Sequence, residues 1–331
     1  MSRDLLSLVE PVSADAPCGT DLEDTQLLAS FDAFRIFGSA TPLPSETEWR
    51  TIRDQSLQAL GQSRDLRLLA HLAAALLRID GLEAFCAAVT VADRWLSERW
   101  DQVYPRVEED ALLRKNALNC LADRMAVVDA LRRASIVSHR QLGSFCLRDL
   151  ELASGQLAPT EADTHPPNAS QIEAALTASP VDDLAALDEH VRGGTASLRN
   201  IVRIMQERGG YESAPDLDAL LKPMVQIDKL LSDHLATRRT AAEAAAGEHG
   251  GSDGASAAGA PGQIRSRQDA IRSIDAVSAF FRQHEPSSPV PLLLERAKRL
   301  VSKSFMEVLE DIAPDSLTQV RLIGGIREEG Q

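Results

Sequence analysis

The stretch that decides the fold is SETEWRTIRDQSLQALGQSRDLRLLAHLAAALLRIDG, residues 45–81. Its first half predicts a helix with a capping box at Ser45 and Glu48 and an end at Gly61. Its second half predicts a helix that Ser63 caps and Gly81 stops. Apolar residues recur at helical spacing in both halves. The two predicted apolar faces consist of Trp49, Ile52, Leu57 and Leu60, and of Leu66, Leu69, Leu72, Leu76 and Leu77.

The flanking sequence extends this pattern. Residues 1–44 are interrupted by prolines and glycines, so we expect an ordered arm with short helices at best, lying over a helical domain. A third helix is predicted from Leu82 to about Trp100. A fourth is predicted from about Ala111 to Ala134. Its expected inward residues are Leu113, Ala117, Leu121, Met125 and Val128. Short connections between such helices indicate antiparallel neighbours.

Composition agrees with a helical fold. Apolar residues make up 44% of the 331 residues, whereas aromatic residues make up only 4%. This mixture favours helices packed on helices over a β-sandwich. The predicted fold class is all-α, with a helical-bundle N-terminal domain, a small helical middle domain, a flexible linker and an oligomerising helical C-terminal domain.

Composition shifts place the predicted domains at 1–152, 170–237 and 263–331, with a flexible linker at 238–262. In the middle domain we expect helices at about 181–208 and 215–235. Gly193-Gly194 is expected to bend or split the first, and Pro223 to kink or divide the second. The linker is rich in Ala, Gly and Ser without bulky apolar residues, so nothing offsets the entropy of ordering it.

The C-terminal segment reads HEPSSPVPLLLERAKRLVSKSFMEVLEDI over residues 284–312. Ser288 stands where an N-cap should, and Pro289 follows at the first helical position. An apolar stripe then runs through Leu293, Ala297, Leu300, Val301, Val308 and Ile312. The stripe is either the private core of a small domain or an oligomer interface. Residues 263–331 are few for independent stability, which favours the interface.

Charge and cysteine content exclude several classes of protein. The net charge of −14 argues against a role in coating nucleic acid. Residues 263–331 carry equal numbers of acidic and basic side chains, so this segment can self-associate without repulsion. The four cysteines are far apart, which makes a disulfide framework or a zinc site improbable. There is no apolar signal region or membrane-length run, so we expect a cytoplasmic protein without membrane insertion.

Motifs for catalysis are missing from the sequence. It contains no phosphate-binding glycine loop, no G-x-S-x-G elbow and no H-E-x-x-H pair. His71 could be a ligand or a base, but a surface or boundary histidine is the favoured interpretation. Glu108-Glu109-Asp110 could bind a cation, although a position before a helix favours an interaction with its dipole. We therefore predict no catalytic residue, no cofactor and no metal.

Two further clusters have both a structural and a functional interpretation. Trp95, Trp100 and Tyr104 could line a groove for a partner peptide, but such residues more often form the core of a helical domain. A basic cluster could meet an acidic partner or simply form a solvated face. It consists of Arg296, Lys298, Arg299 and Lys303.

Short sequence motifs at both ends of the chain resemble those of one family, the TssA proteins of bacterial type VI secretion systems. At the C-terminal end these are EPSSPVPLL from Glu285, Glu295-Arg296-Ala297 and Phe305-Met306. The N-terminal half resembles the family's ImpA N-terminal domain. There the matching words are Pro17-Cys18-Gly19 with Asp21-Leu22, Arg64-Asp65-Leu66-Arg67, Trp100 with Tyr104-Pro105, and Arg114-Lys115-Asn116-Ala117-Leu118.

The resemblance implies a cytoplasmic, non-enzymatic protein that forms a high-order ring and organises baseplate and tail tube and sheath assembly. Its partners would be other copies of itself and type VI baseplate, tube and sheath proteins. Together with the stripe, the predicted oligomerisation residues are Glu285, Pro286, Ser288, Pro289, Pro291, Leu293, Ala297, Leu300, Val301, Val308 and Ile312. The chain resembles the family's short form, which favours a baseplate organiser over a distal-end cap of the growing sheath. The alternatives are that cap, a helical adaptor that forms no large ring, and an enzyme with a site shared between subunits.

Overall fold

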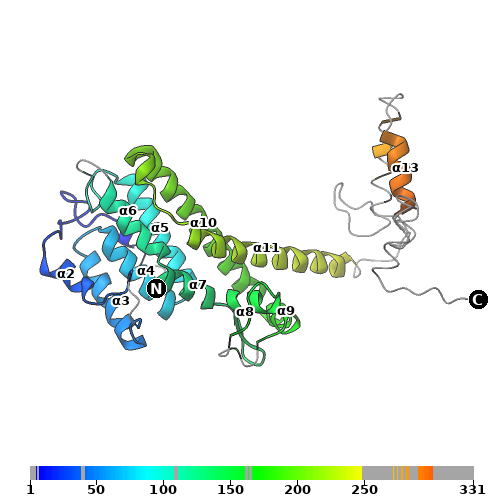
Figure 1. The fold of residues 1–331 in the computed structure, drawn as a ribbon, viewed down its shortest axis with the longest axis horizontal. Coiled ribbons are helices and arrows are strands. Elements are labelled where there is room, and N and C mark those ends of the chain that lie inside the picture. The colour runs from blue at the N-terminus through cyan, green and yellow to red at the C-terminus, as the bar shows by residue number, and fades with distance from the viewer. Residues whose placement is uncertain are drawn as a thin grey trace, which may run out of the picture. The chain divides into compact units, whose positions relative to one another are not determined.

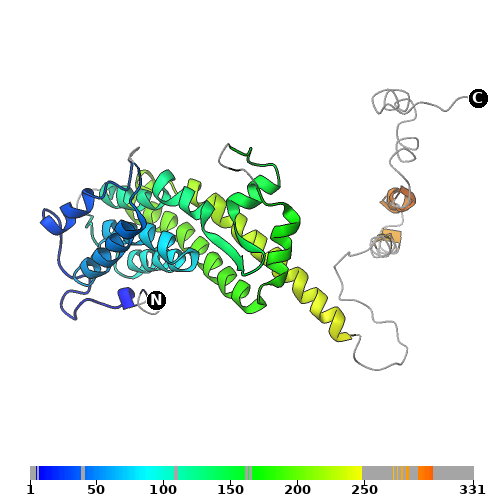
Figure 2. The same cartoon turned by 90° about the horizontal axis from the view of Figure 1, so that it is seen from below.

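The computed structural model describes residues 5, 7–38, 42–107, 111–160, 163, 166–247, 271, 274, 277–278, 281–282 and 290–300. The chain forms two compact units, Met1–Gly250 and Gly251–Gln331. The first holds almost all of the described residues (Figures 1 and 2). The described residues are predominantly helical, and the predicted all-α fold class is confirmed. The division of the first unit into an N-terminal and a middle domain stays a prediction.

The elements follow one another in this order along the chain. The helical ones are η1 (Ser7–Val9), α2 (Gln26–Asp32), α3 (Glu46–Leu60), α4 (Leu66–Ile79), α5 (Leu82–Glu98), α6 (Leu112–Asn119), η2 (Cys120–Ala122), η3 (Arg124–Val128), α7 (Asp129–Arg133), α8 (Leu147–Ala153), α9 (Ala169–Ala178), α10 (Val181–Gly209), η4 (Tyr211–Ser213), α11 (Asp218–Gly247) and α13 (Val290–Leu300). Between α7 and α8 lie two antiparallel strands, β1 (Ser135–His139) and β2 (Gly143–Cys146).

The core of the first unit is a series of long helices, each packed on the next. Helix α3 packs on α4, α4 on α5, α5 on α10, and α10 on α11 (Figure 1). Helix α4 buries ten of its fourteen residues, because neighbours cover it on most sides. The capping box of Ser45 and Glu48 is present, and Gly61 is the C-cap of α3. Trp95, Trp100 and Tyr104 are buried, so their interpretation as core is confirmed.

The predicted cap of the second helix is wrong by two residues. Asp65 is the N-cap of α4, and its Oδ1 accepts a hydrogen bond from the Arg67 amide at 2.8 Å. The hydroxyl of Ser63 is buried without a hydrogen-bond partner among the described residues. A carboxylate stabilises the positive end of a helix dipole better than a hydroxyl, and Asp65 is close enough to do so.

The predicted fourth helix is also wrong, because the chain breaks at Asp123. Its backbone turns to φ −56° and ψ 128°, and its carboxylate accepts hydrogen bonds from the Met125 and Ala126 amides at 3.0 and 2.7 Å. Asp123 thus caps a new helical turn, as short polar side chains do. The break changes which side chains face inward. Leu113 and Met125 are 55% and 50% exposed, whereas Ala117 and Leu121 are buried as predicted.

The two glycines of α10 do not split the helix, which runs uninterrupted from Val181 to Gly209. A Cβ on Gly194 would lie 2.9 Å from the Sγ of Cys86, so the missing side chain lets α10 approach α5 closely. Pro223 does not divide α11 either, since it lies inside one continuous helix. In both views the last turns of α11 project beyond the other helices of the first unit (Figures 1 and 2).

The β1–β2 hairpin was not predicted. Its strands bury Ile136, Val137 and Phe145, and the register shifts between Ser135 and Val137, as at a β-bulge. The arm before α3 agrees with expectation, since its described residues form short helices, η1 and α2. In the second unit the structure describes α13. Of the predicted linker 238–262, residues 238–247 belong to α11, and residues 248–262 lie outside the described residues.

Candidate functional site

A buried arginine holds the N-terminal arm against the helices. Arg64 lies between α3 and α4 and is 5% exposed. Its Nη2 donates to the carbonyl oxygen of Glu10 at 2.8 Å, and its Nη1 donates to the carbonyl of Leu60. The Glu10 carbonyl belongs to the arm and the Leu60 carbonyl ends α3. One guanidinium therefore ties the arm to the helical core.

The motif Pro17-Cys18-Gly19 lies against the loop between α3 and α4 that contains Arg64. The Arg64 amide donates to the Cys18 carbonyl at 2.8 Å, and the Thr20 amide donates to the Gln62 carbonyl at 3.1 Å. Gly19 has a φ of +73°, and a Cβ there would lie 2.0 Å from the Gln62 oxygen. No other residue fits that position without displacing the backbone, so the arm's path depends on this glycine.

A second buried arginine organises the segment before α6. Arg114 is fully buried. Its Nε donates to the Pro105 carbonyl at 2.6 Å, and its Nη2 donates to the carbonyls of Trp100 and Val103 at 2.7 Å each. The guanidinium also lies over the Trp100 ring, 4.6 Å from its centroid. Burial lowers the pKa of Arg114 to about 10, which leaves the side chain a cation at neutral pH. Arg64 and Arg114, with these carbonyls, are called the arginine frame below.

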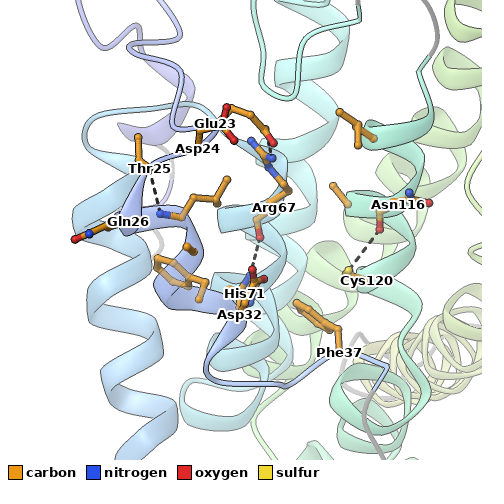
Figure 3. Close-up of a pocket in the computed structure, with 15 residues that line it drawn as sticks. Glu23, Asp24, Thr25, Gln26, Asp32, Phe37, Arg67, His71, Asn116 and Cys120 are labelled. Carbon is orange, nitrogen blue, oxygen red and sulfur yellow. Dashed lines mark hydrogen bonds and ion pairs between the residues drawn. The ribbon is translucent and has the colours of Figure 1, made fainter.

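Beside the frame lies a groove with a volume of about 600 Å³, bounded by α2, α4 and α6 (Figure 3). We call it the α2–α6 groove. Its apolar surface comes from α2, the loop after α2, α6 and the first residue of η2, whereas α4 contributes Arg67 and His71. The apolar lining residues are Leu28, Ala29, Phe31, Phe37, Leu113, Ala117 and Cys120. Its volume falls within the range of about 300–1,000 Å³ that is usual for ligand sites.

The polar groups on the floor of the groove already have partners. Arg67 points from α4 toward Glu23, with which it forms an ion pair (Figure 3). Its Nη2 also lies 2.7 Å from the Oδ2 of buried Asp65. His71 Nδ1 lies 2.9 Å from the Arg67 carbonyl oxygen. Its ring is edge-on to Phe31 and Phe37, at centroid distances of 5.1 and 4.9 Å. Burial lowers the pKa of His71, so the ring is neutral at physiological pH.

The rim of the groove differs from its floor. Asp24 and Asp32 are exposed, and neither carboxylate has a hydrogen bond or an ion pair among the described residues. Leu113 also lines the groove with more than half of its side chain in solvent. The groove thus combines an apolar wall with free negative charge at its edge.

Comparison with known proteins identifies the chain. A family model described as ImpA, N-terminal, type VI secretion system, matches residues 9–123. The type VI secretion system component TssA1 of Pseudomonas aeruginosa is 31% identical over 347 aligned positions, which cover 98% of this chain and 99% of that protein. The chain belongs to the TssA family of type VI secretion system proteins.

The fold of this TssA family member also matches a solved structure. That structure is the N-terminal domain, including the conserved ImpA_N region, of the TssA component of the type VI secretion system from Burkholderia cenocepacia. The match has a TM-score of 0.54 at 22% sequence identity and covers 70% of this chain and 94% of that one. At this identity the likeness shows the fold alone. The arginine frame and the wall of the groove formed by α2 and α4 lie within the ImpA N-terminal match.

The predicted oligomerisation residues of this TssA chain lie in the second unit. Helix α13 contains Pro291, Leu293, Ala297 and Leu300, and Leu293 is 64% exposed. The others lie outside the described residues. These are Glu285, Pro286, Ser288, Pro289, Val301, Val308 and Ile312. Their role in oligomerisation stays a prediction.

The sequence does not predict the groove. The helical spacing of Leu113 predicts a core position, and the position of His71 in the sequence does not indicate which residues lie near it. The acidic run at 108–110 lies outside the described residues. Where residues are described, no three His, Cys, Asp or Glu side chains gather as a metal site would require. No described helix has the length and apolar character needed to span a bilayer.

Proposed function

We propose that this chain is a non-enzymatic, cytoplasmic assembly component of a type VI secretion system. In this proposal residues 263–331 form a high-order ring, and the ring organises baseplate and tail tube and sheath assembly. The observation that carries the proposal is the alignment with TssA1, which extends over 98% of the chain and therefore includes both the ImpA N-terminal region and the C-terminal segment.

Two properties of the C-terminal segment support self-association. Its ten basic and ten acidic side chains cancel, so copies do not repel one another through net charge. Helix α13 carries Leu293 largely in solvent, on a stripe that continues in the sequence to Ile312. An apolar stripe on an amphipathic helix is a usual means of helix association.

The test is the absolute mass of the full chain, measured by light scattering after size-exclusion chromatography over a hundredfold range of concentration. The proposal predicts one discrete high-order species. The double variant Leu293→Glu with Leu300→Glu should convert it to monomers, because each carboxylate would be buried in the interface. Leu142→Glu is the matched control, since Leu142 is a partly exposed leucine of the β1–β2 turn.

A monomeric wild-type chain would contradict the ring and favour the adaptor. The place of the ring is a separate question. We propose that the ring acts at the baseplate rather than at the distal end of the sheath. Fluorescence imaging of the tagged chain in cells with growing sheaths distinguishes the two, and signal that travels with the far end would overturn the baseplate assignment.

A further inference from the structure

The α2–α6 groove has the features of a docking site for one kind of partner. We propose that it binds an amphipathic helix of another type VI secretion subunit, whose apolar side chains are flanked by lysines or arginines. This inference deepens the proposed function and rests on it, since it names the surface by which the assembly component holds a partner.

The first argument is the chemistry of the groove wall. Phe31, Phe37 and Ala117 line the groove, and Leu113 stands at its edge with 55% of its surface exposed. An apolar occupant that covered this leucine would remove its apolar surface from water, which is favourable. The wall therefore indicates an apolar occupant.

The second argument is charge complementarity. Asp24 and Asp32 lie at the rim, and neither has a partner in the described part of the chain. Arg67 does not offset them, because it is paired with Asp65 and Glu23. His71 adds no charge at neutral pH, since burial lowers its pKa. An incoming lysine or arginine would meet free carboxylates, whereas an acidic segment would be repelled.

The third argument concerns the form of the occupant. The walls are helices α2, α4 and α6, whose backbone groups bond within each helix, and no strand edge is among the described residues that line the groove. An extended peptide would therefore find no backbone groups with which to form a ladder. A helix that inserts apolar side chains spaced by three and four residues needs none. The groove thus suits a helix better than a strand.

The fourth argument is the backbone around α2. Asp24, just before the helix, has a φ of +59°, and Arg35, just after it, has a φ of +47°. Residues other than glycine rarely adopt this left-handed conformation, and such positions often occur at ligand-binding segments. Figure 3 shows Asp24, Gln26 and Asp32 on the α2 side of the groove, across from Asn116 and Cys120 of the α6 side.

The experiment measures binding of a labelled 14-residue peptide, LKKLLKLLKKLLKL, to the full-length protein by fluorescence anisotropy in 150 mM salt. We expect saturable binding that weakens as salt is raised. The peptide LEELLELLEELLEL has the same apolar face with opposite charge and should not bind measurably. Hydrogen exchange should show peptide-dependent protection confined to residues 26–32 and 112–119.

Matched variants of the full chain test whether the groove is the site. Asp24→Lys with Asp32→Lys should weaken binding at least tenfold, whereas Asp182→Lys with Asp183→Lys, the same charge change in the first turn of α10, should change it less than twofold. Ala29→Trp should block the groove, because Ala29 lines it and is exposed. Ala33→Trp, on an exposed residue just past α2 that does not line the groove, is its control.

Absence of binding, or an equal loss in the two charge variants, would overturn the groove proposal. So would protection that spreads over the whole first unit. These outcomes leave the ring untouched, since its test is the mass of the full chain without peptide. A chain that is monomeric yet binds the lysine peptide in the groove would retain the docking site and lose the ring.

Discussion

The two arginines of the motif Arg64-Asp65-Leu66-Arg67 have different roles. Arg64 is buried, and its guanidinium donates to main-chain carbonyls of the arm and of α3. Arg67, one helical turn later, faces the α2–α6 groove and pairs with the carboxylates of Asp65 and Glu23. Residues three apart at a helix start can face different surroundings, and here one face is the arginine frame and the other is the groove.

One sequence motif thus contributes both to the stability of the fold and to the lining of the groove. In the frame hydrogen bonds join the two guanidinium groups to main-chain carbonyls, and Nη1 of Arg114 is buried without a partner among the described residues. Loss of either side chain would leave buried carbonyls unpaired. At the rim of the groove the carboxylates have no partner among the described residues, so a change there removes no contact. Stability should therefore depend on the frame, and binding on the groove.

The largest effect is expected from Arg114→Met. Methionine keeps much of the packing, but the carbonyls of Trp100, Val103 and Pro105 lose their donor in a buried site. We expect a loss of about 4 kcal/mol in the free energy of unfolding, measured by urea denaturation followed by circular dichroism. Arg203→Met is the control. Arg203 forms an exposed ion pair with Glu207, which is worth at most about 0.5 kcal/mol. Equal losses in the two variants would contradict a stabilising frame.

The next effect is expected from Gly19→Ala, paired with Gly155→Ala. Both glycines have a φ of +73°, but a Cβ meets the Gln62 oxygen only at Gly19. The backbone cost of about 1 kcal/mol should be common to both variants. The steric conflict should add about 2 kcal/mol at Gly19 alone. If the two midpoints of urea denaturation shift by the same amount, the close approach of the arm is not what this glycine provides.

A smaller, pH-dependent effect on the free energy of unfolding is expected at His71, which lines the groove. Burial holds the pKa of His71 below its ordinary value of 6.5. Below pH 6.5 the unfolded chain binds a proton that the folded chain does not, so stability falls as pH falls toward the lower, folded-state pKa. His71→Gln should reduce this loss by no more than about 1.4 kcal/mol per pH unit, the limit for one proton. The measurement is urea denaturation from pH 7.5 to 5.

His190→Gln controls for the loss of a histidine bonded to its own helix, since His190 Nδ1 lies 2.7 Å from the Ala186 carbonyl oxygen. An unchanged pH slope in His71→Gln would mean that the two phenylalanine rings do not restrict protonation of His71.

The smallest effect on stability is expected from Asp24→Asn with Asp32→Asn. Both side chains are exposed without a partner in the described part of the chain, so the free energy of unfolding should change by less than about 0.5 kcal/mol. Thermal denaturation checks this. A loss above about 1 kcal/mol would show that the two carboxylates hold α2 in place, and the contrast between frame and groove would then fail.

Much of the fold was predictable because its signals are local. The Ser45 and Glu48 capping box, the glycine ends and the apolar spacing of α3, α4 and α5 all depend on residues within one or two turns. The errors came where a competing local bond or a distant partner decided the outcome. Asp65 rather than Ser63 caps α4, Asp123 interrupts the fourth helix, and Gly194 allows close packing on Cys86 instead of a break.

The groove could not be predicted, because no short stretch of sequence contains it. Its residues come from α2, α4, α6 and the segments beside them, which span nearly one hundred positions, and Leu113 has the helical spacing of a core leucine.

By itself the sequence determined the helical class, the positions of most helices of the first unit and the family words at both ends. Helix periodicity and capping depend on residues that are close in the sequence, so they can be recognised without a structure. Only the tertiary structure decided that Arg64 and Arg114 in these motifs are buried and form the arginine frame. It also decided that Arg67 and His71 face a groove instead. Burial and pairing depend on which segments meet in space, and that meeting is a property of the packed chain.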